Sequence, residues 1–146
     1  MHRYQILIEY VGTNFVGWQI QSKGKSIQKL IQTKLSKLLK EKILLIGSGR
    51  TDSGVHAIEQ SAHFECKKEI QNIDKFLKSI NHFVNDMSVS IINIKKRNIN
   101  FHARFSAKQR IYKYIIFNRL SRPSIEKGRG WHIIKELDVT LMKEGA

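Results

Sequence analysis

Residues 47–57 read Gly47-Ser48-Gly49-Arg50-Thr51-Asp52-Ser53-Gly54-Val55-His56-Ala57 and lie between two strand-like runs, Ile43–Ile46 and Gln60–Cys66. Three glycines in eight residues permit backbone angles that other residues avoid, and they let another molecule approach the main chain closely. One arginine and one carboxylate, Arg50 and Asp52, stand two positions apart in this loop. The segment therefore predicts two strands joined by a loop that carries a candidate reactive pair.

The segments before and after these two strands predict the remaining helices and strands of the fold. Tyr4–Tyr10 alternates as a strand does, and Ser26 reads as the N-cap of a helix that runs to about Lys42. A second helix begins after Asn72 or Asp74, either of which can cap it, and a further strand runs from Val89 to about Lys96. The order strand, helix, strand, strand, helix, strand predicts an α+β fold of the ferredoxin-like type, an antiparallel sheet with both helices on one face.

The loop between the first strand and the first helix contains two aromatic residues, Phe15 and Trp18. Exposed rings in a loop stack on nucleic-acid bases, whereas buried ones cap a core. The sequence leaves both interpretations open.

The charge balance points to a polyanionic partner. Lys and Arg number 26 against 12 acidic residues, a formal net charge of +14. Such an excess favours nucleic acid over a membrane surface, and the remaining alternative is a solvated basic face. No apolar run approaches the length of a membrane span, and the single cysteine, Cys66, fits a reducing compartment. We expect a cytoplasmic protein in which Cys66 is a small core or flanking residue of a strand.

The segment from Lys95 to Arg129 is the most basic part of the chain, with eleven Lys or Arg residues and one acid, Glu126. Aromatic residues are interleaved with these cations, and Ile111–Phe117 alternates like a fifth strand. Cations for phosphates and rings for bases are what single-stranded or loop RNA requires, the alternative being an edge strand with a basic outer face. A last helical pattern begins at Leu137. We expect a ferredoxin-like domain at 1–97, a basic and aromatic RNA-binding strand and loop at 98–136, and the start of a further domain at 137–146.

Several common sites are excluded by spacing. The glycine loop lacks the Gly-Lys-Ser/Thr ending of a Walker phosphate loop, and Asp52 stands where a dinucleotide-binding loop has its third glycine. The six histidines and one cysteine show no paired ligand spacing, so we expect no metal site. His63, His82 and His102 are interpreted as surface or polar core residues.

Four segments, in order, resemble the tRNA pseudouridine synthase A family. They are Tyr10–Gln19, the loop Gly49–Ala57, Phe101–Ala107 and Arg110–Tyr114. The family usually has alanine where Ser53 stands, which is a mild departure.

The resemblance implies isomerisation of uridine to pseudouridine at positions 38–40 of the tRNA anticodon stem–loop, with no metal and no organic cofactor. Asp52 matches the family's catalytic aspartate, and Arg50 matches the arginine beside it. Tyr112 matches the tyrosine that stacks on the target uracil. Arg104, His102 and Arg110 match the basic and aromatic segment that contacts RNA.

The resemblance also implies a larger assembly, because members of the family form homodimers and continue for roughly another domain. The chain therefore resembles the N-terminal half of such an enzyme. The alternatives are a catalytically incomplete RNA-binding fragment of this type and a small basic interaction domain with no role in RNA.

Overall fold

The computed structural model describes residues 1–84 and 87–145 and divides into two compact units, Met1–Gln109 (unit 1) and Arg110–Ala146 (unit 2). The main elements of unit 1 are β1 (His2–Tyr10), α1 (Ile27–Leu39), β2 (Ile46–Gly47), β3 (Ala57–Cys66), α2 (Ile73–Val84) and β4 (Val89–Arg97). A short 3-10 turn, η1 (Gly12–Asn14), follows β1. This order confirms the predicted βαββαβ fold class.

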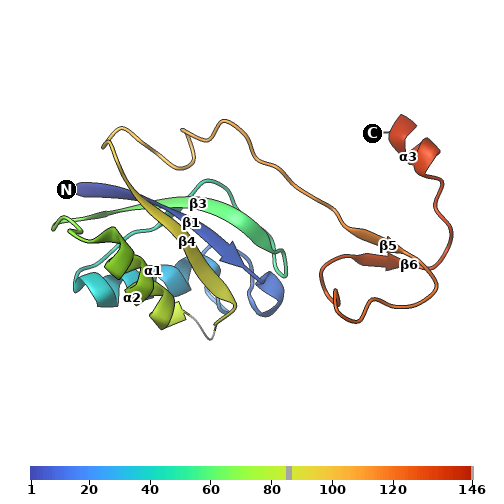
Figure 1. Cartoon of the computed structure of the whole chain (residues 1–146), viewed down its shortest axis with the longest axis horizontal. Coiled ribbons are helices and arrows are strands. Elements are labelled where there is room, and N and C mark those ends of the chain that lie inside the picture. The colour runs from blue at the N-terminus through green and yellow to red at the C-terminus, as the bar shows by residue number, and fades with distance from the viewer. Residues whose placement is uncertain (85–86, 146) are drawn as a thin grey trace. The chain divides into compact units, whose positions relative to one another are not determined.

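The four strands form one antiparallel sheet in the order β2-β3-β1-β4. In β1, Gln5 lies opposite His63 of β3 on one side and Lys95 of β4 on the other. Both helices lie on the same side of the sheet (Figure 1), which leaves the opposite side for other segments. We call that opposite side the open face of the sheet.

The core lies between the sheet and the helices. Alternate residues of β1, from Tyr4 to Tyr10, are buried, as the period of a strand with one covered face requires. They pack with the buried stripes of the helices, which are Ile27, Ile31 and Leu35 in α1 and Ile80 and Val84 in α2. Each large apolar side chain that is fully buried stabilises the fold by roughly 1.5–3 kcal/mol.

Both predicted helices are capped as their sequences indicate. The side-chain oxygen of Ser26 accepts a hydrogen bond from the backbone N–H of Lys29 at 3.3 Å, and α1 ends at Lys40 in the left-handed conformation. At α2 the cap is Asn72, whose side chain accepts from the backbone N–H of Lys75 at 2.8 Å. This contact selects Asn72 over Asp74.

The strand predicted at Ile43–Ile46 is wrong in its bounds, because β2 comprises only Ile46–Gly47. The apolar residues Ile43 and Leu45 are buried, but polar side chains of α1 bind their backbone groups. Ser36 accepts the N–H of Ile43 at 3.0 Å and Gln32 accepts that of Leu45 at 3.1 Å. These bonds replace the pairing that a neighbouring strand would provide.

Unit 2 contains β5 (Ile116–Asn118), β6 (Trp131–Ile133) and α3 (Val139–Glu144), with the two strands paired in parallel. The strand predicted at Ile111–Phe117 is wrong in its extent, because pairing with β6 begins only at Ile116. The helix expected from Leu137 is present as α3 and is capped by Asp138. No described side chain of unit 2 is buried.

Over residues 1–84 and 87–145, no helix is both long and apolar enough to cross a membrane.

Candidate active site

The loop at residues 47–57 is bound to the loop that follows β1. The backbone N–H of Trp18 donates to the carbonyl oxygen of Thr51 at 3.0 Å, and that of Gly54 donates to the carbonyl oxygen of Phe15 at 3.3 Å. The hydroxyl of Ser53 donates to the same Phe15 oxygen at 3.1 Å. The residues on both sides of Asp52 are therefore held by backbone contacts with a segment more than thirty residues earlier.

Side chains of β1, of β3 and of His56, which directly precedes β3, add three further contacts. The hydroxyl of Tyr10 lies 2.8 Å from Oγ1 of Thr51, and the amide of Gln60 donates to the carbonyl oxygen of Gly49 at 2.8 Å. Nδ1 of His56 accepts the backbone N–H of Gly12 at 3.0 Å, so this ring nitrogen acts as an acceptor in the contact. Tyr10 and His56 lie in segments that resemble the family, but no sequence pattern gave them or Gln60 a role, because only tertiary contacts reveal it.

Two glycines of the first loop are required by the closeness of the two backbones. A Cβ on Gly12 would lie 2.0 Å from the carbonyl oxygen of Val55. Gly17 has a φ of +104°, and a Cβ there would lie 2.5 Å from the carbonyl oxygen of Thr51. The two loops therefore touch through their main chains.

The open question about Phe15 and Trp18 is settled by their burial. Only 7% of Phe15 and 2% of Trp18 is exposed, so both cap the core and neither is available to stack on a base. The indole of Trp18 lies against Gly47, where a Cβ would come within 2.6 Å of it. The ring thereby supports the start of the loop that carries Asp52.

Asp52 and Arg50 are both exposed on this loop. The described residues include no ion pair between them. An exposed carboxylate on a loop fixed at both ends is suited to act on a bound molecule, as a nucleophile or as a base.

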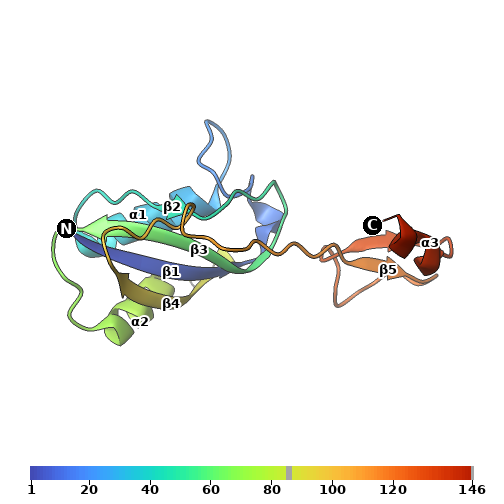
Figure 2. The ribbon, with the colours of Figure 1, turned by 90° about the horizontal axis from the view of Figure 1, so that it is seen from above.

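Residues 98–106 follow β4 and pass over the open face of the sheet, opposite α1 and α2 (Figures 1 and 2). The guanidinium of Arg3 donates to the carbonyl oxygens of Ile99 and, at 2.5 Å, Phe101. The backbone N–H of Ala103 donates to Nδ1 of His63 at 3.1 Å. We call residues 98–106 the strap.

Two of the predicted RNA-binding residues lie in the strap. The ring of His102 is half-buried, and its Nδ1 accepts the backbone N–H groups of Arg104 at 3.2 Å and Phe105 at 3.4 Å. The strap thereby forms a tight turn that exposes Arg104 and Phe105 among its side chains, the latter 79% exposed. His102 is therefore structural through Nδ1 and keeps only Nε2 for a ligand.

Burial sets the protonation of two residues of β3. It lowers the pKa of His63 to about 4, helped by the positive charge of Arg3, so the ring is neutral near pH 7. It raises the pKa of the Cys66 thiol to about 11. Cys66 is fully buried, which confirms its interpretation as a core residue.

The other predicted residues, Arg110 and Tyr112, belong to unit 2, and both are exposed. They lie before β5, in a segment without regular secondary structure.

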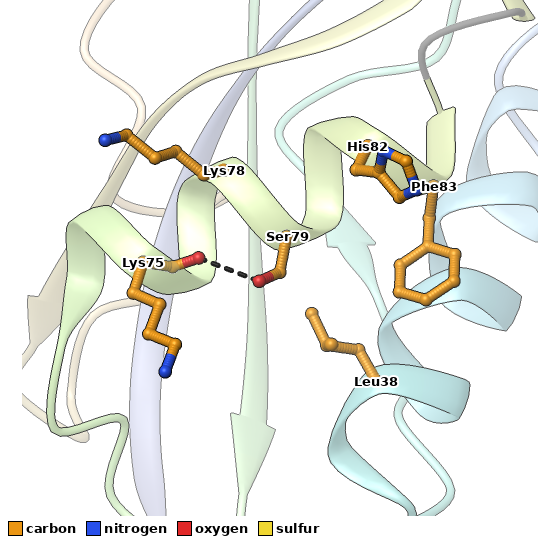
Figure 3. A pocket seen from close by; sticks show the side chains of 6 residues that line it. All are labelled: Leu38, Lys75, Lys78, Ser79, His82 and Phe83. Atoms are coloured by element: carbon orange, nitrogen blue, oxygen red, sulfur yellow. Dashed lines mark hydrogen bonds between the residues drawn. The ribbon is translucent and has the colours of Figure 1, made fainter.

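A shallow groove lies elsewhere, on the helical layer of unit 1 (Figure 3). It is lined by Leu38, Lys75, Lys78, Ser79, His82 and Phe83. The lining includes none of the predicted site residues. Among the described residues no group of three or more potential ligands is placed to hold a metal ion.

Comparison with known proteins shows to which family the chain is similar. A sequence model of a tRNA pseudouridine synthase family matches residues 6–106, which include both the Asp52 loop and the strap. The tRNA pseudouridine synthase A of Pelagibacter ubique (strain HTCC1062) is 79% identical over the whole chain. The proteins of the same name from Anaplasma marginale, strains Florida and St. Maries, are each 40% identical over 99% of it.

The chain spans 59% of the length of each of these curated relatives. The family match covers more than two thirds of the chain and contains the site built above. This chain belongs to the tRNA pseudouridine synthase family.

Proposed function

We propose that this chain takes part in the isomerisation of uridine to pseudouridine in the tRNA anticodon stem–loop, at tRNA positions 38–40, with Asp52 as the nucleophile. The observation that carries the proposal is the family match over residues 6–106, because it includes the loop that exposes the Asp52 carboxylate.

The proposed reaction needs no redox partner, since substrate and product are isomers. The Asp52 carboxylate displaces the uracil from C1′, so that an Asp52 O–C1′ bond forms as the glycosidic N1–C1′ bond breaks. The base then turns, and its C5 displaces the carboxylate as the C5–C1′ bond forms. C5 loses its proton and N1 gains one, so the Asp52 carboxylate is regenerated and the product is an isomer of the substrate. Before this can occur the uridine must leave its stack, which costs a few kcal/mol. A loop fixed on both sides of Asp52 lowers the cost of orienting the carboxylate against the flipped base.

The surrounding residues take supporting roles in the proposal. Arg50 stands two positions before Asp52 on the same loop, where its guanidinium fills the space that the flipped base leaves. Tyr112 stacks on the target uracil. Arg104 and Arg110 contact RNA phosphates, and His102 contributes through Nε2. We assign the chemistry to residues 1–97 and much of the RNA affinity to residues 98–136.

We also propose a cytoplasmic location and a homodimer. The dimer is supported by the apolar side chains that unit 2 exposes, among them Leu120, Ile125 and Trp131, which are 83%, 95% and 69% exposed. Large apolar side chains left exposed on a small unit are candidates for burial against another protomer.

A second candidate function is RNA binding without catalysis. The chain covers 59% of the length of its relative, and the rest of that length can contribute to the site around the substrate. This partial coverage favours the second candidate.

One experiment separates the two functions. Unmodified tRNA is incubated with the 146-residue chain, and with a chimera in which these residues replace the matched part of the Pelagibacter ubique relative. Pseudouridine formed by the chimera supports the proposed reaction. A chimera that is folded and binds tRNA but forms no pseudouridine supports the second candidate instead.

A further inference from the structure

His63 is a buried titratable residue for which the proposed reaction has no role. It lies within β3, and its neighbours in the adjacent strands are Gln5 of β1 and Ile46 of β2. Only 2% of it is exposed. A buried imidazole that does no chemistry needs a structural partner, and here that partner is the strap.

The contact between His63 and the strap is specific. Nδ1 accepts the backbone N–H of Ala103 at 3.1 Å, and Ala103 is itself only 1% exposed. The ring meets that of Phe101 edge-on at 6.1 Å between centroids and that of His102 at 4.8 Å. His63 thus touches three consecutive residues of the strap, and the third is followed directly by Arg104.

Cations of the neighbouring strands hold the first part of the strap. Arg3 of β1 pairs with Glu65 of β3, with Nε donating at 2.9 Å, and also donates to the strap carbonyl groups of Ile99 and Phe101. The guanidinium of Arg97 lies 5.1 Å from the centre of the Phe101 ring. These contacts secure residues 99–101, whereas the turn beyond them is held to the sheet by the contact of Ala103 with His63.

The hydrogen bond requires a neutral ring with its proton on Nε2, because a protonated Nδ1 would point a second donor at the N–H of Ala103. The charged and titratable groups around the ring are Arg3 of β1, Glu65 of β3 and His102 of the strap. Lys95 and Arg97 of β4 lie one strand further, beyond Gln5. Ile46 on the β2 side brings no charge.

We infer that His63 is a positioning residue for RNA binding: as a neutral imidazole it holds Ala103 on the open face and so fixes the turn that presents Arg104. The inference rests on the proposed function for the identity of the ligand, tRNA. His63 itself does not touch the substrate and acts through the strap.

The test compares two substitutions at this position with a matched control. His63→Leu removes the acceptor, whereas His63→Asn keeps an oxygen near the place of Nδ1. His82→Leu makes the same change at an exposed histidine of α2. The readouts are amide hydrogen exchange across the chain and the Kd for an anticodon stem–loop RNA.

We expect His63→Leu to speed exchange at residues 102–106 while the amides of β1 and α1 stay protected. Its affinity for the RNA falls about tenfold, the equivalent of one charge-assisted contact. His63→Asn recovers most of that loss, and His82→Leu shows none. In the wild-type chain at pH 6, the NMR chemical shifts of the two His63 ring nitrogens should show a neutral ring with its proton on Nε2. This measurement uses no variant, so it does not depend on whether a substituted chain folds.

The inference is overturned if His63→Leu binds the RNA as the wild type does, if His63→Asn rescues nothing, or if the wild-type ring is charged at pH 6. Failure of the proposed function has a different signature. In that case the chimera forms no pseudouridine although RNA affinity still follows the His63 substitutions. A wild-type chain without affinity for the RNA overturns both.

Discussion

The carbonyl oxygen of Val55 occupies the space that a side chain on Gly12 would need, since a Cβ on Gly12 would lie 2.0 Å from it. The backbone N–H of the same glycine donates to His56, the residue after Val55. Val55 in turn donates its own N–H to the carbonyl oxygen of Asp52 at 3.2 Å. The position of Asp52 therefore depends on a glycine forty residues earlier in the chain.

Gly12→Ala is expected to destabilise the fold by about 1–3 kcal/mol, because a backbone carbonyl must move to admit the methyl group. Urea unfolding measures the change. The control is Gly145→Ala, where the new Cβ would lie 3.6 Å from its nearest neighbour, an ordinary contact. Equal stability of Gly12→Ala and the wild type would show that the two loops are not in close contact.

Tyr10→Phe removes the hydroxyl that lies 2.8 Å from Oγ1 of Thr51 and so loosens the residue before Asp52. We expect a loss of about 1 kcal/mol in stability and a roughly tenfold fall in kcat of the chimera. Tyr4→Phe is the matched control. It removes a buried hydroxyl that accepts the N–H of Ile70 at 2.9 Å, far along the chain from the Asp52 loop.

Both variants lose a buried hydrogen bond, but only Tyr10→Phe is expected to lose turnover. Equal kcat values for the two variants would contradict a positioning role for Tyr10.

The regular elements of unit 1 were predictable because each carries its own local signal. The apolar stripe of α1 and its cap at Ser26 indicate the helix without reference to the rest of the chain. The apolar residues of β1 recur at every second position, which likewise indicates a strand with one covered face. Six segments in order, four strands and two helices, were enough to predict the ferredoxin-like topology.

The remaining features depend on partners that a local pattern does not contain. Ile43 and Leu45 look like a strand, yet side chains of α1 bind their backbone. The alternation from Ile111 likewise indicates a strand, but pairing begins only at Ile116. In the site, the glycine loop and Asp52 were visible in the sequence, whereas the contacts of Tyr10, His56 and His63 join segments 40 or more residues apart.

The pH dependence of stability tests the buried state of His63. Its pKa is about 4 in the folded chain and near 6.5 when unfolded, so between these values the unfolded chain binds a proton that the folded chain does not. Above about pH 6.5, His63 should make no pH-dependent contribution to the free energy of unfolding. As the pH falls from 6.5 toward 4, protonation of His63 in the unfolded chain should lower that free energy by at most about 3 kcal/mol.

The comparison that isolates this effect is wild type against His63→Asn, by urea unfolding at a series of pH values. Asparagine does not titrate, so the gap between the two curves should change as the pH falls below 6.5. Curves that stay parallel from pH 7.5 to pH 4.5 would rule out a neutral, buried His63.

The salt dependence of tRNA binding tests the exposed turn of the strap. If Arg104 contacts a phosphate, Arg104→Ala should lower the slope of log Kobs against log salt by about 0.7–0.9, one released counterion. The control is Lys78→Ala, which removes a cation that lines the groove on the helical layer. The assignment of Arg104 fails if the two substitutions change the slope equally.

The central claim is that the Asp52 carboxylate is the nucleophile, and tritium release from tRNA labelled at C5 of uridine measures it most directly. Asp52→Asn in the chimera keeps the size of the side chain and removes its charge, and Glu59→Gln makes the same change at an exposed carboxylate of β3. We predict that Asp52→Asn lowers the rate by about 10³-fold or more while tRNA binding is retained, and that Glu59→Gln leaves the rate unchanged. Tritium release by Asp52→Asn at the wild-type rate would contradict the account.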